Sequence, residues 1–92
     1  MSRKTVVTVI GQDQVGIVAR VAGCLADNRV NIEDINQKIL GGTIFAMTLL
    51  ADMEASPLDL PELSTRLQAS VEGMGLKVVV QDAEVFRYMH RV

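Results

Sequence analysis

The stretch GQDQVGIVARVAG, residues 11–23, joins an apolar run to a helical pattern through a short turn of glycine and polar residues. Residues 5–10 before it (TVVTVI) are β-branched and apolar on both faces, which predicts a strand in the centre of a sheet. We expect Asp13 to cap the following helix and Asn28 to end it in a left-handed conformation. Apolar residues recur between them at helical spacing: Val18, Val21, Ala22 and Leu25.

Two further strands are predicted next, joined by a tight turn. Residues 31–40 (NIEDINQKIL) carry apolar side chains on one face and charged or amide side chains on the other. Ile32 is out of phase with Ile35, so either a β-bulge separates them or Ile32 belongs to the preceding turn. Gly41-Gly42 predicts a two-residue hairpin loop, followed by a return strand over residues 43–51 that is apolar on both faces.

A second helix is indicated by its capping residues. Asp59 and Glu62 have the spacing of a capping box, and Pro61 suits the first helical turn. We expect Gly75 to close this helix and residues 76–83 to form a fourth strand. The apolar stripe of the helix is Leu60, Leu63, Leu67, Val71 and Met74.

The predicted order βαββαβ gives an α+β, ferredoxin-like fold: a four-stranded antiparallel sheet with two helices on one face. The first and third strands lie in the centre, which agrees with their apolar character on both faces. We expect a single domain over residues 1–92, with a core over 4–84 and a short C-terminal tail helix over 85–92. The sheet face away from the helices still carries apolar side chains, which dimerisation or the tail would cover.

Composition narrows the environment and the partners. The 92 residues carry a formal net charge of −2, with 49% apolar and 22% charged residues, as in ordinary globular chains. Because so small a core leaves little stability in reserve, we expect a homodimer. No basic stripe or run of aromatics indicates nucleic acid binding, and no apolar stretch approaches the roughly 20 residues of a membrane span. The lone Cys24 and the absence of a signal-peptide pattern predict a cytoplasmic protein.

Several chemistries known on this fold lack their residues here. The first loop has neither the Cys-x-x-Cys pair of metal chaperones nor the phosphate-binding arginine of acylphosphatases, and Phe45 is the only aromatic residue on the central strands. His90, the only histidine, is far in sequence from Cys24, so no nucleophile–base pair is predicted. Adjacent Glu33 and Asp34 point to opposite strand faces and cannot share a metal ion. We therefore expect no enzyme, no cofactor and no metal site.

The first loop is the stretch whose chemistry best suits a ligand. Free amides in the first turn of a helix bind anions such as a carboxylate. Gly16 lies in this predicted first turn, where glycine costs about 1 kcal/mol relative to alanine. Either the turn requires this glycine sterically, or another backbone or a ligand approaches it closely.

Residues 11–39 resemble the opening of an ACT domain, a small-molecule-sensing module of amino-acid metabolism. The whole chain is similar to a family of stand-alone bacterial and archaeal ACT proteins, through N-I-x-D-I-x-Q at 31–37 and F-x-x-M-H-R-aliphatic at 86–92. It also resembles the ACT units of the glycine-cleavage repressor and of formyltetrahydrofolate deformylase. The pattern G-x-D-x-x-G-I-V of the opening is met by Gly11, Asp13, Gly16, Ile17 and Val18.

The resemblance implies a regulatory module, usually dimeric, that binds an amino acid where the first loop of one subunit meets the second strand of its neighbour. Asn31 and Ile32 would contact the ammonium side of the ligand or close the pocket. ACT sensors usually belong to a larger enzyme or regulator, so in a chain of one domain either the signal would leave through a partner protein or the domain would have lost its ligand. The amides for the α-carboxylate would come from Asp13, Gln14, Val15, Gly16 and Ile17. The alternative is an interaction module without a small-molecule ligand, whose contact surface is the tail: Phe86, Tyr88, Met89 and Arg91.

Overall fold

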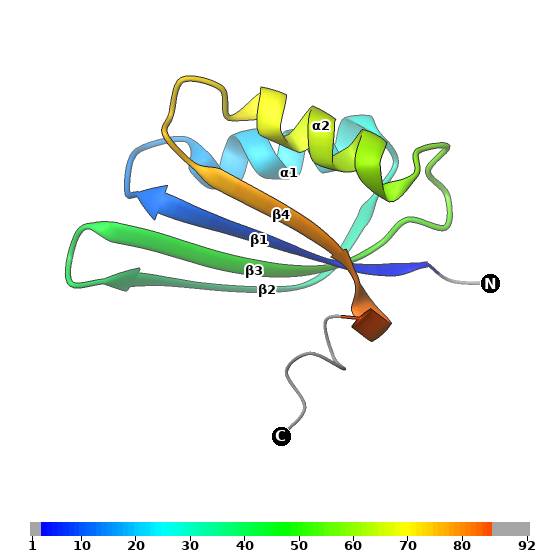
Figure 1. Ribbon diagram of the computed structural model, residues 1–92, viewed down its shortest axis with the longest axis horizontal. Coiled ribbons are helices and arrows are strands. Elements are labelled where there is room, and N and C mark those ends of the chain that lie inside the picture. Colours follow the sequence, from blue (N-terminus) through cyan, green and yellow to red (C-terminus); the bar gives the residue numbers. More distant parts are fainter. Residues whose placement is uncertain (1–2, 86–92) are drawn as a thin grey trace.

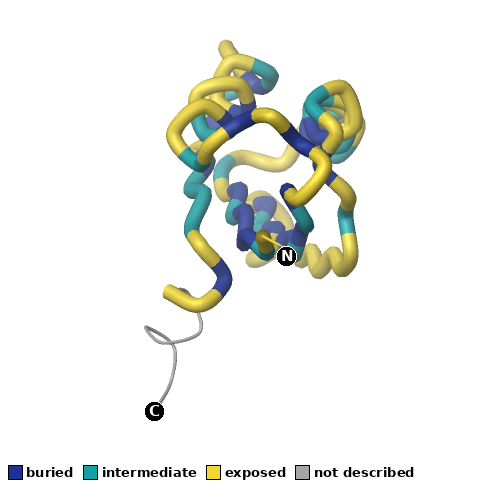
Figure 2. Tube along the Cα trace, turned by 90° about the vertical axis from the view of Figure 1, so that its right-hand side faces the viewer, coloured by how far each residue is buried: buried dark blue, intermediate teal, exposed yellow. Residues whose placement is uncertain are grey.

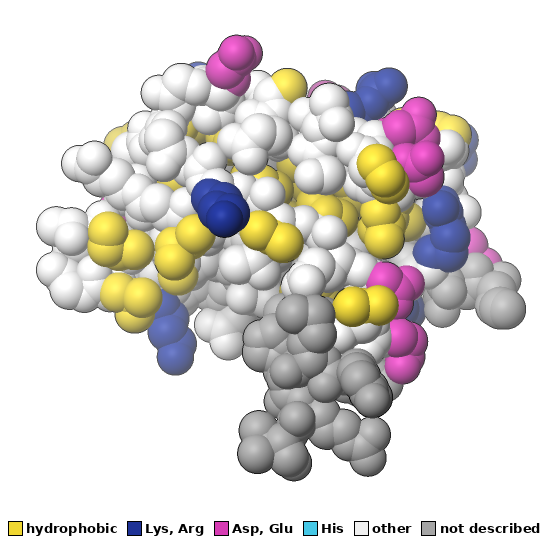
Figure 3. All heavy atoms as spheres, viewed as in Figure 1, with side chains coloured by type: hydrophobic (Ala, Val, Ile, Leu, Met, Phe, Trp, Pro, Cys, Tyr) yellow, Lys and Arg dark blue, Asp and Glu magenta, His cyan; other side chains and the backbone are white. Residues whose placement is uncertain are grey.

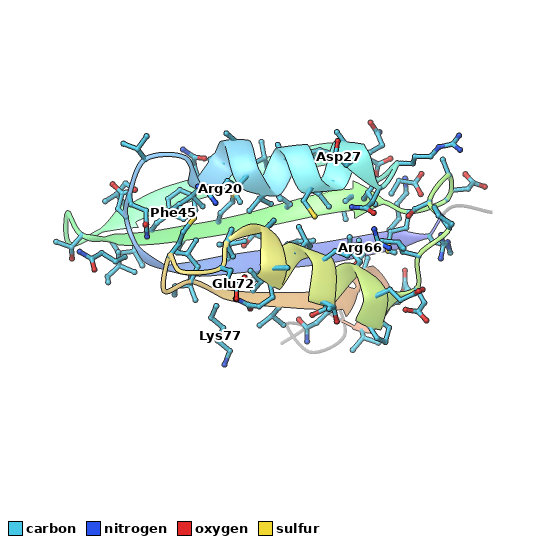
Figure 4. The ribbon with its side chains drawn as sticks, turned by 90° about the horizontal axis from the view of Figure 1, so that it is seen from above. Arg20, Asp27, Phe45, Arg66, Glu72 and Lys77 are labelled. Carbon is cyan, nitrogen blue, oxygen red and sulfur yellow. The ribbon has the colours of Figure 1, made fainter. Side chains whose placement is uncertain are left out.

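An antiparallel sheet of four strands lies beneath two helices (Figure 1). The computed structural model describes residues 3–85. The strand order β2-β3-β1-β4 puts β1 and β3 in the centre and confirms the predicted ferredoxin-like fold. Seen from above, the two helices run side by side over one face of the sheet (Figure 4). The elements are β1 (Lys4–Gln12), α1 (Ile17–Asp27), β2 (Asn31–Leu40), β3 (Ile44–Asp52), α2 (Leu60–Ser70) and β4 (Lys77–Asp82).

The core lies between the sheet and the helices, where the buried segments of Figure 2 meet. Alternate residues of the central strands face the helices: Val7 and Val9 of β1, and Phe45, Met47, Leu49 and Ala51 of β3. The helices contribute buried residues spaced four apart to the same core: Ile17, Val21 and Leu25 of α1, and Leu63 and Leu67 of α2. Each fully buried aliphatic side chain of this set contributes about 1.5–3 kcal/mol relative to exposure.

A β-bulge at the start of β2 decides which side chains of that strand reach the core. The register of β2 against β3 shifts between Ile32 and Asp34, so Glu33 is the extra residue. Ile32 then lies opposite Ala51 and Ile35 opposite Leu49, on the helix side of the sheet in both cases. The bulge alternative predicted from the phase of the two isoleucines is confirmed.

The hairpin loop is one residue longer than predicted. Leu40 pairs with Ile44, so Gly41, Gly42 and Thr43 form a three-residue loop. The amide of Thr43 donates to the carbonyl of Leu40 at 3.2 Å. Both glycines have positive φ, 60° and 78°, which is why this turn needs them.

The helix ends differ from prediction in two places. Asn28 caps α1 with φ −104°, and the left-handed residue is Arg29, with φ 61°. The side-chain amide of Asn28 instead donates to the carbonyl of Cys24 at 2.7 Å. α2 ends at Ser70 rather than at Gly75, and residues 71–75 form a turn.

The predicted capping box of α2 is confirmed. The amide of Glu62 donates to Oδ1 of Asp59 at 2.8 Å, and the amide of Asp59 donates to Oε1 of Glu62 at 2.9 Å. After β4, residues 83–85 are helical, and the rest of the predicted tail helix lies outside the described residues. No helix within residues 3–85 is long and apolar enough to cross a membrane.

Gly11 is the glycine at which another backbone comes close. A Cβ there would lie 2.8 Å from the carbonyl oxygen of Gly75 and 2.7 Å from Cδ2 of Leu76. The last turn before β4 therefore packs directly on the end of β1, and only a residue without a side chain permits the contact.

Gly11→Ala should lower the free energy of unfolding by about 1–3 kcal/mol, because the added methyl group displaces the backbone at Gly75. Equilibrium unfolding in urea measures this change. The matched control is Gly23→Ala in the middle of α1, where a Cβ meets open space, and it should raise stability by about 0.5–1 kcal/mol. Equal effects at the two positions would contradict this account of Gly11.

Candidate functional site

The first loop, residues 13–16, is held at the end of the sheet beside the β2–β3 hairpin. The amide of Asp13 donates to the carbonyl of Thr43 at 2.8 Å. The side-chain amide of Gln14 donates to the carbonyls of Gln12 and Met74, at 3.1 and 2.7 Å. The loop is thus fixed between the hairpin on one side and the α2–β4 turn on the other.

α1 begins at this loop without a side-chain cap, contrary to the prediction for Asp13. The N-cap is Gly16, with φ 96°, and no side chain of the described chain caps the helix. The first intrahelical bond runs from the amide of Arg20 to the carbonyl of Gly16, at 3.0 Å. The amides of residues 17–19 precede it and have no acceptor within the helix. No acidic residue lies in this first turn, so its partial positive charge is not neutralised there.

Gly16 is required by its conformation and not by a close contact. Nothing lies within 4 Å of the position that its Cβ would occupy. Of the two alternatives left open for Gly16, the structure supports the conformational one within the chain, and the close backbone approach lies at Gly11. Val15 is 98% exposed, and Asp13 and Gln14 are exposed as well, while Ile17 is buried in the core. Of the five predicted binding residues, Ile17 could therefore contact a ligand only through its backbone.

The predicted second half of the site lies at the opposite end of the sheet. Asn31 is exposed and pairs with Asp52, on the face away from the helices, while Ile32 packs against the core. β1 runs the length of the sheet between this end and the first loop, a separation of about 27 Å at the usual rise per strand residue. One chain therefore does not bring the loop and Asn31 together.

A group of charged side chains, Lys4, Glu33 and Asp52, lies at the same end of the sheet as Asn31, and the sequence did not predict it. Nζ of Lys4 forms ion pairs with Glu33, and with Oδ2 of Asp52 at 3.4 Å. Glu33 of the bulge is thus paired with Lys4. The pKa of Lys4 is raised, chiefly by Glu33. The pKa of Asp52 is lowered, chiefly because the amide of Glu54 donates to its Oδ1 at 2.9 Å.

The remaining candidates for chemistry do not form a centre in the described part of the chain. Cys24 is a free, half-buried thiol, and burial raises its pKa. Across residues 3–85, no three His, Cys, Asp or Glu side chains are placed to hold a metal ion. His90 and the proposed contact residues of the tail lie outside the described residues.

Comparison with known proteins gives a consistent result over most of the chain. A family model of the ACT domain matches residues 3–81. The chain is 45% identical to the UPF0237 protein of Methanocaldococcus jannaschii over 92 residues, which is 100% of both chains. Its fold superposes on an ACT domain protein from Streptococcus pneumoniae with a TM-score of 0.80 and 31% identity, over 94% of this chain and 96% of that one.

Two larger proteins share the fold. A formyltetrahydrofolate deformylase from Pseudomonas syringae pv. tomato gives a TM-score of 0.79 at 22% identity, over 89% of this chain and 28% of that one. A protein described as a glycine cleavage system transcriptional repressor gives 0.62 at 21% identity, over 88% and 46%. The relatives expected from the loop motif and the terminal motif are therefore confirmed.

The two predicted caps can be compared directly by substitution. Asp13→Ala should change the free energy of unfolding by less than about 0.5 kcal/mol, because its side chain caps nothing. Asp59→Ala should lower it by about 1 kcal/mol, because it removes the acceptor of the Glu62 amide. Thermal or urea unfolding of the two variants measures both changes. A loss at Asp13 as large as that at Asp59 would show that Asp13 caps α1 after all.

The charged group of Lys4, Glu33 and Asp52 should make the free energy of unfolding depend on pH in the acidic range. Because the folded-state pKa of Asp52 is lowered, its contribution is present above the unfolded value of about 3.9 and is lost as pH falls through the folded value. Asp52→Asn should therefore flatten the fall in unfolding free energy below about pH 4. Urea unfolding from pH 7 to pH 2 tests this, and an unchanged slope would contradict it.

Proposed function

The chain belongs to the ACT domain family, and we propose that it is a small regulatory protein that binds an amino acid or a related metabolite between two copies of itself and modulates a partner protein. The observation that carries the proposal is the start of α1. Its first amides have no side-chain cap and no neutralising acidic residue, beside a loop whose side chains are exposed. An α-carboxylate placed there would accept from these amides and complement the helix dipole.

The edge strand β2 supports a second copy as the other half of the site. Nine of its ten residues are exposed, so both its faces and its outer edge are accessible to another strand. The other edge, β4, is partly covered by Gln68, whose side chain donates to the carbonyl of Leu76 at 3.0 Å and accepts from the amide of Val78 at 3.3 Å. Pairing between copies is therefore favoured at β2.

Antiparallel pairing of two β2 strands would bring together the two half-sites, which lie at opposite ends of the sheet in one chain. In such a pair, the Leu40 end of one strand lies beside the Asn31 end of the other. The first loop is bonded to the hairpin at Thr43, three residues beyond Leu40. It would therefore come to lie near Asn31 and Ile32 of the second copy. Asn31 offers both a donor and an acceptor to the polar groups of an amino acid.

A thermal unfolding screen of the amino acids at millimolar concentration tests the proposal. A ligand at 100 times its dissociation constant should add about 2.7 kcal/mol of stability and raise the unfolding midpoint accordingly. If no amino acid or related metabolite shifts the midpoint, the sensor proposal fails, and an interaction module without a small-molecule ligand becomes the better interpretation.

The position of the site is tested by removing one amide. Ala19→Pro deletes an N–H in the first turn of α1, where proline is tolerated and where the exposed side chain packs little. Ala19→Pro should weaken ligand binding at least about tenfold, which corresponds to 1.4 kcal/mol. The rise in the unfolding midpoint caused by the ligand should become smaller or disappear. Ala19→Ser keeps the amide and is the matched control. Equal binding by both variants would place the ligand elsewhere.

A further inference from the structure

The sheet face away from the helices, which we term the open face, is covered at one end and exposed at the other. The open-face side chains of β1 are Val6, Thr8 and Ile10, and their exposed fractions rise in that order, from 6% at Val6 to 42% at Ile10. Hydrophobic side chains gather on the surface at the end of the molecule that holds the β2–β3 hairpin (Figure 3). Val6 lies toward the other end and is not part of the core between the sheet and the helices. What buries Val6 therefore lies on the open face.

The end of β4 brings the chain to this covered end. Gln81, the last open-face residue of β4, pairs with Val6. Residues 83–85 are helical and lie on the side of the sheet away from the helices (Figure 1). Ala83 is only 7% exposed and, like Val6, is outside the core cluster. The chain therefore enters residues 86–92 from a helical turn that lies beneath the open face.

Residues 85–92 (VFRYMHRV) have the sequence pattern of an amphipathic helix that continues this turn. At helical spacing the basic residues Arg87, His90 and Arg91 fall on one side. The apolar and aromatic residues fall on the other side: Val85, Phe86, Tyr88, Met89 and Val92. A helix with this pattern requires an apolar surface on which to lie.

A row of side chains that crosses the open face from β4 to β2 offers such a surface; we term it the end row. Strand pairing places it in the order Gln81, Val6, Leu50 and Asp34. Leu50 is half-buried, and Asp34 is exposed. A shallow hollow of about 530 Å³ is lined by Val6, Leu50 and Asp34 and extends along β2 and β3. The end row thus begins beside the end of β4, is apolar in its middle and ends at a carboxylate.

We propose that residues 86–92 form a helix that crosses the open face of their own chain along the end row. A helix over residues 83–92 is about 15 Å long, and the end row crosses three strand spacings, which is about 14 Å. This length sets Phe86 near Val6 and Met89 near Leu50. The proposal does not rest on the proposed ligand site, because it uses neither the first loop nor Asn31.

Charge favours this course across the strands over a course along β1 toward the hairpin. A helix along β1 would carry its basic residues toward Lys38 and Lys77, which both lie in the open-face row of Ile10. The end row leads instead to Asp34, whose Oδ1 accepts from the amide of Ile35 at 2.9 Å. Arg91, near the far end of the helix, would lie beside this carboxylate.

Fluorescence of Tyr88 tests the proposal in the full chain, which has one tyrosine and no tryptophan. The ring would lie against the sheet, so acrylamide should quench it at least about twofold less in the folded chain than in the chain unfolded in urea. Leu50→Lys places a positive charge beneath the helix and repels its basic side, so quenching should rise toward the unfolded value.

The matched control is Thr65→Lys on the exposed side of α2, which should be quenched as the wild type is. Far-ultraviolet circular dichroism checks that both variants are folded. Equal quenching of the folded and the unfolded wild type would show that the tail is open to solvent or to a partner, and it overturns the proposal. Wild-type quenching in a folded Leu50→Lys variant overturns it as well.

A disulfide trap tests whether the helix lies on its own chain or on a second copy. In a Cys24→Ser background, Leu50→Cys with Met89→Cys should form a disulfide under mild oxidation, since bridged cysteines need Cα atoms about 4.4–6.8 Å apart. The product should run as a single chain without reductant and have no free thiol. Thr65→Cys with Met89→Cys is the matched control and should keep both thiols. Free thiols in the Leu50–Met89 variant, or a disulfide-linked dimer of it, overturn the proposal.

Discussion

Hydrogen bonding of β1 along both of its edges is the constraint on which the rest of the structure depends. β1 pairs with β3 from Lys4 to Gln12 and with β4 from Thr5 to Ile10. The two ladders hold Val7 and Val9 beneath the helices and direct the intervening residues to the face away from the helices. They also fix the end of β1, so that Gly11 meets the turn at Gly75 and the first loop leaves the sheet at a defined place.

The fold could be predicted because its signals are local and agree with one another. β1 and β3 are apolar on both faces, which agrees with the central places that the order βαββαβ gives them. The capping box at Asp59 was predictable because side-chain chemistry at fixed spacing produces it. The end of α2 was not, since Val71 lies in the turn and is nevertheless buried at 1% exposure. Apolar periodicity cannot distinguish a core residue in a turn from one in a helix.

The candidate site was only partly predictable. The loop motif correctly marked the place where α1 begins, but Gly16 starts the helix through its own positive φ, whereas an aspartate side chain was expected. The sequence cannot reveal such a backbone solution, because glycine serves close approach and positive φ equally well. The position of Asn31 relative to the first loop also depends on which residues of neighbouring strands pair. This register forms between residues that are far apart in the sequence. The ion pairs of Lys4 could not be predicted because they join residues that are far apart in the sequence.

The bulge at Glu33 makes one position of β2 dispensable for the pairing of that strand with β3. A strand that paired every residue in turn would set Glu33 opposite Ala51, carry Ile32 onto the face away from the helices and carry Asn31 onto the helix side. Deletion of Glu33 would instead leave Ile32 opposite Ala51 and Asp34 opposite Leu50, in a regular ladder without a bulge. It would also remove one ion-pair partner of Lys4. A gap at position 33 in an alignment of related chains would therefore mark a protein whose second strand keeps the same faces without the bulge.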